Sequence, residues 1–324
     1  MAQIYRDRLD HLPPELAAAA QEFVAWSQEQ LLVEQVESTP TEPLYHYTGE
    51  VALKGILGNQ HLWCFSHLHQ RDKTEFAYSL GIARQVIHEV GLSNDFFTHH
   101  FCGCLDDLLN NNSLTDTFEF YMSSLSRHRD DPQQWAEYGY AGRGFAIGFA
   151  PELFQPDETE LKEQANENLH VGRVIYGDEA TERRHRQVIE RAADIVSRHG
   201  RAHIDAVRRL GPVPYLRTIV DEVIASQLIW NCLTAKSMRY ANEREVRYVV
   251  LNLRGKFDAH RKMFDGKAYI EAKLPLKEMG SLAEILVGPL APDDAEQKLR
   301  QFLDEQGYPA VPVSRSIARF ELAQ

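Results

Sequence analysis

Three short stretches of the chain carry polar side chains that are two residues apart. The pairs are His46 and Thr48 in LYHYT, Ser124 and Ser126 in FEFYMSSLS, and Glu243 and Glu245 in NEREVRYVV. Alternate residues of a strand point to the same face, so each pair would act on one side of a sheet. Two carboxylates at this spacing repel each other, and the pKa of one of them can rise. Such a pair can orient a hydroxyl group and accept its proton.

Each pair also has an ordinary structural interpretation. A histidine in a strand is more often a core residue, and Ser-x-Ser is common at strand ends and helix caps. Glu243 and Glu245 could lie on a solvated surface and pair with a neighbouring arginine such as Arg247. Trp135 and Tyr138, which follow the serine stretch, could be packing aromatics. The functional interpretation therefore rests on the combination of the three stretches and on their order.

The elements that must position these residues alternate without a regular strand–helix–strand rhythm. Hydrophobic periodicity predicts strands over 44–48, 61–66, 118–126, 144–150, 168–178, 244–253, 283–290 and 310–320. The same criterion predicts helices over 14–36, 50–60, from about 73 to 90, over 179–212, from 214 to about 238 and over 291–307. Residues 93–116 are predicted to be irregular. This order predicts an α+β fold with a mixed, mostly antiparallel sheet core and surrounding helices.

A polar, proline-broken stretch, ESTPTEP, separates the first predicted helix from the rest of the chain. We therefore expect residues 1–42 to form an N-terminal helical extension. Residues 43–324 are expected to form a single α+β domain of catalytic type. A heavily charged helical insertion is expected at about 179–238 of this domain.

Composition narrows the class of protein. The 324 residues are 44% hydrophobic and carry a formal net charge of −12, which favours a folded, soluble chain and opposes non-specific nucleic-acid binding. No apolar run reaches membrane-spanning length, and the first residues lack a signal peptide's hydrophobic region. We expect a cytoplasmic protein with no membrane contact. Four cysteines in so long a chain are typical of reduced thiols rather than of a disulfide framework.

A resemblance to a known family is carried by short blocks spread over about residues 43–320. In order, the blocks are LYHYT, ALKGIL, LWCFS, SSLS, WAEYG, GRGFAIGF, KSMRYANEREVRYVV and EILVGP. They resemble the bacterial domain-of-unknown-function family numbered 2971. That family in turn is similar to the ADP-ribosyltransferase superfamily, as a distant relative. The resemblance implies an ADP-ribosyltransferase-like fold and NAD as the substrate.

The resemblance also implies a cofactor-binding role for the first two stretches. His46 with Thr48 is similar to the superfamily's His-Gly-Ser/Thr element, which grips the adenosine ribose and the nicotinamide amide. Tyr47 stands here in place of the glycine. Ser124 and Ser126, with a leucine between them, look like the superfamily's Ser-Thr-Ser strand.

Glu245 then matches the catalytic carboxylate, and Glu243 matches the upstream glutamate that orients the acceptor. Breaking the nicotinamide–ribose bond creates an oxocarbenium-like centre, which a carboxylate stabilises. The resemblance implies that Tyr138 or Trp135 stacks on the nicotinamide ring. Arg71 lies in a polar block after the second predicted strand, where it would approach the ligand or begin the next helix.

Other interpretations stay open. The stretches HLWCFSHLH and THHFCGC contain metal-binding residue types, but Cys-x-Cys is not the usual zinc spacing, and no metal is expected. Clustered arginines over 181–210 are interleaved with acids, which indicates a solvated helix face or a docking surface for an unknown protein or nucleic-acid acceptor. Two functions remain: an NAD-dependent ADP-ribosyltransferase or NAD glycohydrolase, and a non-catalytic nucleotide- or protein-binding module with the same fold.

Overall fold

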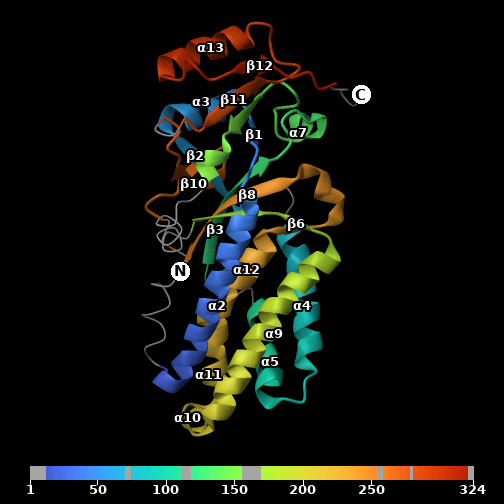
Figure 1. The fold of residues 1–324 in the computed structure, drawn as a ribbon, viewed down its shortest axis with the longest axis vertical. Helices are drawn as coiled ribbons and strands as arrows, with labels where there is room; N and C mark the ends of the chain where they lie inside the picture. Colours follow the sequence, from blue (N-terminus) through green and yellow to red (C-terminus); the bar gives the residue numbers. More distant parts are fainter. Residues whose placement is uncertain are drawn as a thin grey trace.

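A computed structural model of the chain describes residues 12–69, 74–110, 118–154, 169–253, 255, 258–277 and 280–319. It has a large sheet with a bundle of long helices on one side and shorter helices on the other (Figure 1). The α+β class and the mixed, mostly antiparallel sheet predicted from the sequence are confirmed. No described helix is both long enough and apolar enough to cross a membrane.

The main sheet has ten strands. Eight of them lie side by side in the order β12-β11-β4-β1-β3-β2-β10-β9, and the other two are β8, which pairs with β3, and β5, which pairs with β8. The strands are β1 (Leu44–Thr48), β2 (His61–Ser66), β3 (Phe118–Ser126), β4 (Phe145–Phe149), β5 (Leu169–Arg173), β8 (Glu245–Leu253), β9 (Lys262–Phe264), β10 (Lys267–Lys273), β11 (Leu282–Val287) and β12 (Val313–Arg315). All of these pairings are antiparallel except that between β11 and β12. A second, parallel pair is formed by β6 (Ile175–Tyr176) and β7 (Ala235–Lys236).

Strand β3 has a different arrangement on each of its edges. Along one edge it pairs with β8 over its whole length, from Phe118 to Ser126. The other edge is shared, because β2 pairs only at Tyr121 and Met122, and β1 pairs only at Ser126. The sheet therefore opens between β1 and β2, next to residues 123–125 of β3.

The helical bundle covers the face of β3, β5 and β8 (Figure 1). It contains α2 (Pro14–Ser38), α4 (Glu75–Gly91), α5 (Phe96–Asn110), α9 (Asp178–Ala202), α10 (Ile204–Leu210), α11 (Pro212–Ile219) and α12 (Ala225–Leu233), with a π-helical turn η3 (Val220–Ile224) between the last two. Phe120, Met122, Val249 and Leu251 pack into this bundle's core. These four residues occupy alternate positions on their two strands, as the pleat of a sheet requires.

The intervening positions of the same strands face a second core, to which Tyr121, Leu125, Val246 and Val250 contribute. Helices α3 (Glu50–Asn59) and α13 (Ala295–Gln306) cover that side. The shorter segments are α7 (Pro132–Glu137), η1 (His67–His69), η2 (Pro151–Phe154) and η4 (Met238–Glu243). With a core on each face, β3 and β8 are fixed in register, and so are the polar residues at their adjoining ends.

Three sequence-based expectations differ from the structure. Residues 96–110, expected to be irregular, form α5, because Phe97, Phe101, Leu105 and Leu108 recur at helical spacing and are buried. The helix expected to reach about 238 ends at Leu233, where the chain turns into β7. The hairpin of β9 and β10 was not predicted.

The segment expected to be an N-terminal extension is part of the bundle. Leu16, Ala20 and Phe23 of α2 are fully or almost fully buried in the same core as α9 and α12. Glu34 of α2 also pairs with Arg184 of α9 at 2.6 Å and accepts a hydrogen bond from Trp230 of α12 at 2.7 Å. Helix α2 is thus packed as an integral helix of the fold.

Candidate functional site

The opening beside β3 is a cavity of 190 Å³, which we call the carboxylate cavity. Side chains from β1, β2, β3, the segment after α7 and the start of β8 line it, among them His46, Tyr47, Trp63, Phe65, Ser124, Ser126, Tyr138, Glu243 and Glu245. Most of the residues singled out in the sequence thus lie around one space, although they are up to 199 positions apart in the chain. The sheet brings them together because β1, β3 and β8 are neighbours.

The two glutamates enter the cavity from different elements. The helical turn η4 ends at Glu243, and Arg244 adopts a left-handed conformation with φ of 43° before β8 begins at Glu245. Glu243 and Glu245 are therefore not alternate residues of one strand, as the sequence suggested. They are nevertheless brought together, because both carboxylates contact the ammonium group of Lys236 on β7.

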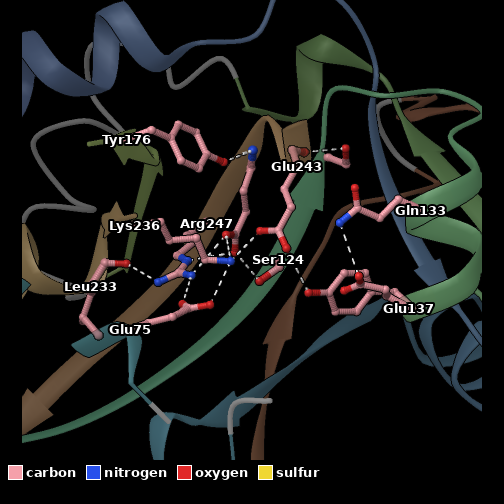
Figure 2. Close-up of polar contacts among 12 residues, drawn as sticks. Glu75, Ser124, Gln133, Glu137, Tyr176, Leu233, Lys236, Glu243 and Arg247 are labelled. Carbon is pink, nitrogen blue, oxygen red and sulfur yellow. Dashed lines mark hydrogen bonds and ion pairs between the residues drawn. The ribbon is translucent and has the colours of Figure 1, made fainter. Parts of the chain in front are cut away.

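Five charged side chains form a buried cluster behind the cavity, and Figure 2 shows most of them (Glu75, Lys236, Glu243 and Arg247). The Nζ atom of Lys236 lies 2.5 Å from Glu243 Oε2, 2.8 Å from Glu245 Oε2 and 2.9 Å from Glu75 Oε1. Arg247 donates from Nε to Glu245 Oε1 at 2.8 Å and from Nη2 to Glu75 Oε2 at 2.5 Å. Three carboxylates thus share two cations.

The cluster carries one net negative charge when all five groups are ionised. The side chains of Lys236 and Arg247 are each 3% exposed, so this imbalance is held away from water. Burial raises the pKa of Glu243 above that of an exposed glutamate, and Lys236 only partly offsets this. Burial acts in the same direction on Glu245, but Arg247 and Lys236 outweigh it and hold its pKa well below the usual range. Glu245 is therefore the ionised member, and Glu243 is the one that takes up a proton.

Ser124 connects the cluster to β3. Its Oγ donates a hydrogen bond to Glu245 Oε1 at 2.5 Å, and Ser126 Oγ donates to the backbone oxygen of Glu243 at 2.8 Å. Ser124 lies opposite Arg247, and Ser126 lies opposite Glu245, in the β3–β8 ladder. The hydroxyl of Tyr176 on β6 accepts from the backbone N–H of Glu245 at 2.9 Å (Figure 2). The start of β8 is thus fixed on both sides.

His46 reaches across the opening from β1. Its Nδ1 lies 3.0 Å from the backbone oxygen of Ser124. A carbonyl oxygen can only accept, so Nδ1 carries the proton and Nε2 is left as an acceptor. Burial lowers the pKa of His46, which keeps the ring neutral at pH 7.

The aromatic candidates divide into one that meets the cavity and one that does not. Tyr138 is 37% exposed and donates to Glu243 Oε1 at 3.3 Å. Trp135 is fully buried, with its ring edge-on to Tyr47 at 4.9 Å and its Nε1 donating to Asp130. A ring with no exposed surface cannot stack on a ligand, so Trp135 supports Tyr47, a residue that lines the cavity.

One further candidate lines a different space. Thr48 lines a neighbouring, larger groove rather than the carboxylate cavity. Arg71 lies outside the described residues. Within the part of the chain that the structure describes, no group of three or more His, Cys, Asp or Glu side chains is placed to hold a metal ion.

The structure adds Lys236 and Glu75 to the charged residues around Glu243 and Glu245. Arg247 pairs with Glu245, as its spacing allowed, but both groups are buried instead of solvated. Glu75, the first residue of α4, reaches the same cluster. A lysine immediately after the long uncharged stretch 223–235 was the available signal for Lys236, since a charge at the end of a buried segment must find a buried partner.

A family model matches the part of the chain that contributes several residues of this site. Residues 134–248 match the family described as Protein of unknown function (DUF2971). The predicted resemblance to the domain-of-unknown-function family 2971 is confirmed over this region, which holds Tyr138, Lys236, Glu243, Glu245 and Arg247. His46 and Ser124 lie outside the DUF2971 match. No curated protein and no solved structure matches the chain.

Proposed function

We propose that this protein cleaves the nicotinamide–ribose bond of NAD and acts as an ADP-ribosyltransferase on an unknown macromolecular acceptor, or as an NAD glycohydrolase. One observation carries the proposal. His46, Ser124, Tyr138 and the two glutamates line one cavity, and Ser124 donates a hydrogen bond to the carboxylate of Glu245. This is the set of residues that the resemblance to the ADP-ribosyltransferase superfamily requires to be adjacent.

The charge distribution suits the bond that must break. When the C1′–N1 bond breaks, its electron pair leaves with nicotinamide, and positive charge develops on the ribose. Glu245 is held ionised by Arg247 and Lys236, so a fixed negative charge faces the cavity before the reaction begins. Preorganised charge of this kind is the largest catalytic contribution in many enzymes.

Glu243 is suited to the second half of the reaction. Attack on C1′ by water or by an acceptor nucleophile forms a new bond and releases one proton. Burial raises the pKa of Glu243, which makes its carboxylate a better proton acceptor than an exposed glutamate, and its Oε1 contacts Tyr138 at the cavity. Glycohydrolysis then yields ADP-ribose, nicotinamide and a proton, so the reaction balances with water as the only co-reactant.

His46 has a binding role in this proposal. Its Nδ1–H is already used by the Ser124 carbonyl, so the unprotonated Nε2 would accept from a ribose hydroxyl or from the nicotinamide amide. The cavity has the volume of about six liquid waters at roughly 30 Å³ each. It therefore accommodates only the reacting end of a dinucleotide.

A specific observation favours the second candidate, a non-catalytic nucleotide- or protein-binding module. Both oxygens of Glu245 already accept hydrogen bonds or ion pairs, from Ser124, Arg247 and Lys236. A carboxylate with every acceptor position occupied can serve to hold β3, β7 and β8 together. Such a protein would bind a nucleotide and leave its bonds intact.

One experiment separates the two functions. Purified protein is incubated with NAD, free nicotinamide is measured over time, and NAD binding is measured by calorimetry on the same preparation. The proposed activity predicts nicotinamide release that depends on enzyme concentration. Saturable NAD binding with no nicotinamide release would overturn the proposed activity and establish the binding module.

A further inference from the structure

A groove of 990 Å³ lies beside the carboxylate cavity. We call it the aromatic groove, because Trp63, Phe65, Tyr140, Phe264 and Phe302 line it together with the first turn of α3. Trp63 and Phe65 of β2 line both spaces, so the groove and the cavity are separated by the same two side chains. A ligand that occupies both spaces would pass along these two side chains.

The wall formed by β2 is part of a cluster of aromatic rings that are tilted against one another, by 31° between Trp63 and Tyr269 and by 57° between Trp63 and Phe264. The ring centroid of Trp63 lies 4.9 Å from that of Tyr269 and 5.2 Å from that of Phe264. Gly55 of α3 permits this packing, since a Cβ there would lie 2.7 Å from the Trp63 ring. The wall therefore presents apolar aromatic surface, against which a planar heteroaromatic group can pack.

Tyr140 is held over the groove by an unusual backbone. Tyr140, Ala141 and Gly142 all have positive φ, of 56°, 52° and 77°, and such conformations cost free energy in residues other than glycine. The ring lies over Gly49, where a Cβ would be 3.1 Å from it, and Tyr140 is still 75% exposed. A strained turn that presents an exposed aromatic ring indicates a binding surface.

Arg143 supplies a positive charge to the aromatic groove. It lines the groove, and among the residues that the structure describes its guanidinium has no hydrogen-bond or acidic partner. Two acidic residues of the same groove are already paired, Glu50 with Lys54 at 2.7 Å and Asp294 with Lys298 at 2.8 Å. Asp265 lies at the β9–β10 turn, next to Phe264, whose ring contacts Trp63. A guanidinium next to aromatic side chains is complementary to a base joined to a phosphate.

We propose that the aromatic groove binds an adenine nucleotide, with the base against Tyr140 and the β2 wall and a phosphate on Arg143. In NAD this would be the adenylate half, so the inference deepens the proposed function and rests on it for the identity of the substrate. The sizes of the two spaces are consistent with this assignment, because the carboxylate cavity holds only the nicotinamide end of the dinucleotide.

The test is calorimetric titration of the full chain with ADP and with adenosine. Losing the stacking surface in Tyr140→Ala should raise the Kd for both ligands about tenfold, since one base–aromatic contact is worth roughly that factor. Arg143→Ala should raise the Kd for ADP by a similar factor and leave that for adenosine unchanged. Tyr140→Phe, which keeps the ring, and Arg208→Ala, on the exposed and distant α10, should bind both ligands as the wild type does.

The inference is overturned if the wild type does not bind ADP, or if Tyr140→Ala and Arg143→Ala bind it unchanged. Its failure is distinct from that of the proposed function. ADP binding with the expected variant pattern, but without nicotinamide release from NAD, would establish the groove and refute the glycosidic cleavage. Nicotinamide release from NAD at rates unaffected by Tyr140→Ala and Arg143→Ala would establish the glycosidic cleavage and refute the groove as the adenylate site.

Discussion

At the scale of the residue, the site depends on a buried cluster that is costly to form. Burying an ion is unfavourable unless its partners and hydrogen bonds are complete. Lys236 meets this condition with three carboxylate contacts, and Arg247 meets it with two carboxylates and the Leu233 backbone oxygen at 2.6 Å. The positions of Glu243 and Glu245 are therefore set by residues that need not touch a ligand.

Removing the central cation should destabilise the fold. Lys236→Met leaves Glu75, Glu243 and Glu245 with one cation among them, which should lower the free energy of unfolding by about 3–5 kcal/mol. Denaturant unfolding followed by circular dichroism measures the change. The matched control is Lys54→Met, which removes an exposed ion pair with Glu50 and should cost less than about 0.5 kcal/mol. Equal losses in the two variants would contradict a central role for Lys236.

The raised pKa of Glu243 predicts a pH dependence. If Glu243 accepts the proton of water or of the acceptor, it must be ionised, so nicotinamide release should increase as pH rises through its pKa. That pKa lies above the value of an exposed glutamate because burial disfavours the charge. In Glu243→Gln this acidic limb of the rate profile should disappear. Retention of the same limb in the variant would assign it to another group.

The pKa shifts of Glu243 and Glu245 have opposite effects on the pH dependence of stability. Glu243 has a raised pKa when folded, so its contribution to stability is present at low pH and is lost as pH rises through that value. Glu245 has a lowered pKa, so its contribution is present at neutral pH and is lost as pH falls. Acid unfolding of this protein should therefore include protonation of Glu245.

At the scale of the element, the site exists because β3 has no full partner on one edge. The backbone groups of residues 123–125 that face the opening are available to side chains. Nδ1 of His46 donates a hydrogen bond to the backbone oxygen of Ser124. Helix α4 contributes Glu75 from its first turn, and the end of α12 contributes the Leu233 oxygen. The bundle thus supports the site directly, and its packing should matter to the cluster.

Close packing between α5 and α9 can be tested at one glycine. Gly200 of α9 lies against the Phe97 ring of α5, and a Cβ there would be 2.5 Å from a ring carbon. Gly200→Ala should lower the free energy of unfolding by about 1–3 kcal/mol through overpacking. Gly81→Ala, on the exposed face of α4 with nothing within 4 Å, should raise it by about 0.5–1 kcal/mol. Thermal unfolding of both variants checks the opposite signs.

Much of this architecture could be predicted from the sequence because periodicity is a local property. Strands β1, β3 and β8 and helices α3, α9 and α13 follow from the spacing of their apolar residues. The β9–β10 hairpin was missed, although Asp265-Gly266 between short strands is a typical tight-turn signal. Helix α5 was missed because its histidines and acidic residues obscured an apolar stripe that is regular in the structure.

The site could be predicted only in part. The order of the strands in the sheet is not a local property, so the sequence could nominate His46, Ser124 and Glu245 but could not bring them together. The role of Lys236 could not be predicted either, since it requires the pairing of β6 with β7 beside β8. The buried state of Trp135 likewise follows from its contact with Tyr47, a residue 88 positions earlier.

At the scale of the whole molecule, the bundle packs on one face of β3 and β8 through a single large core. Helix α2 contributes to that core along most of its length, and Phe23 is 1% exposed within it. The chain before β1 is thus required for the fold that carries the site, whether or not it contacts a ligand.

This integration predicts a large effect at the start of the chain. Phe23→Ala should lower the free energy of unfolding by about 3–5 kcal/mol, as expected for a large cavity in a core. Leu32→Ala on the same helix removes a side chain that is 44% exposed, and its cost should be several times smaller. Chemical denaturation of the two variants measures the difference. Similar, small losses would show that α2 is a dispensable extension.

The most direct test of the central claim is the rate of nicotinamide release from NAD by wild-type protein and by Glu245→Gln. If Glu245 stabilises the charge that develops on the ribose, the wild type should release nicotinamide and the variant should lose about two or more orders of magnitude in rate. Ser124→Ala, at an exposed position on β3, should also slow the reaction, and Glu271→Gln on β10 should leave it unchanged. Circular dichroism would verify that each variant is folded. Equal rates for wild type and folded Glu245→Gln would contradict the account.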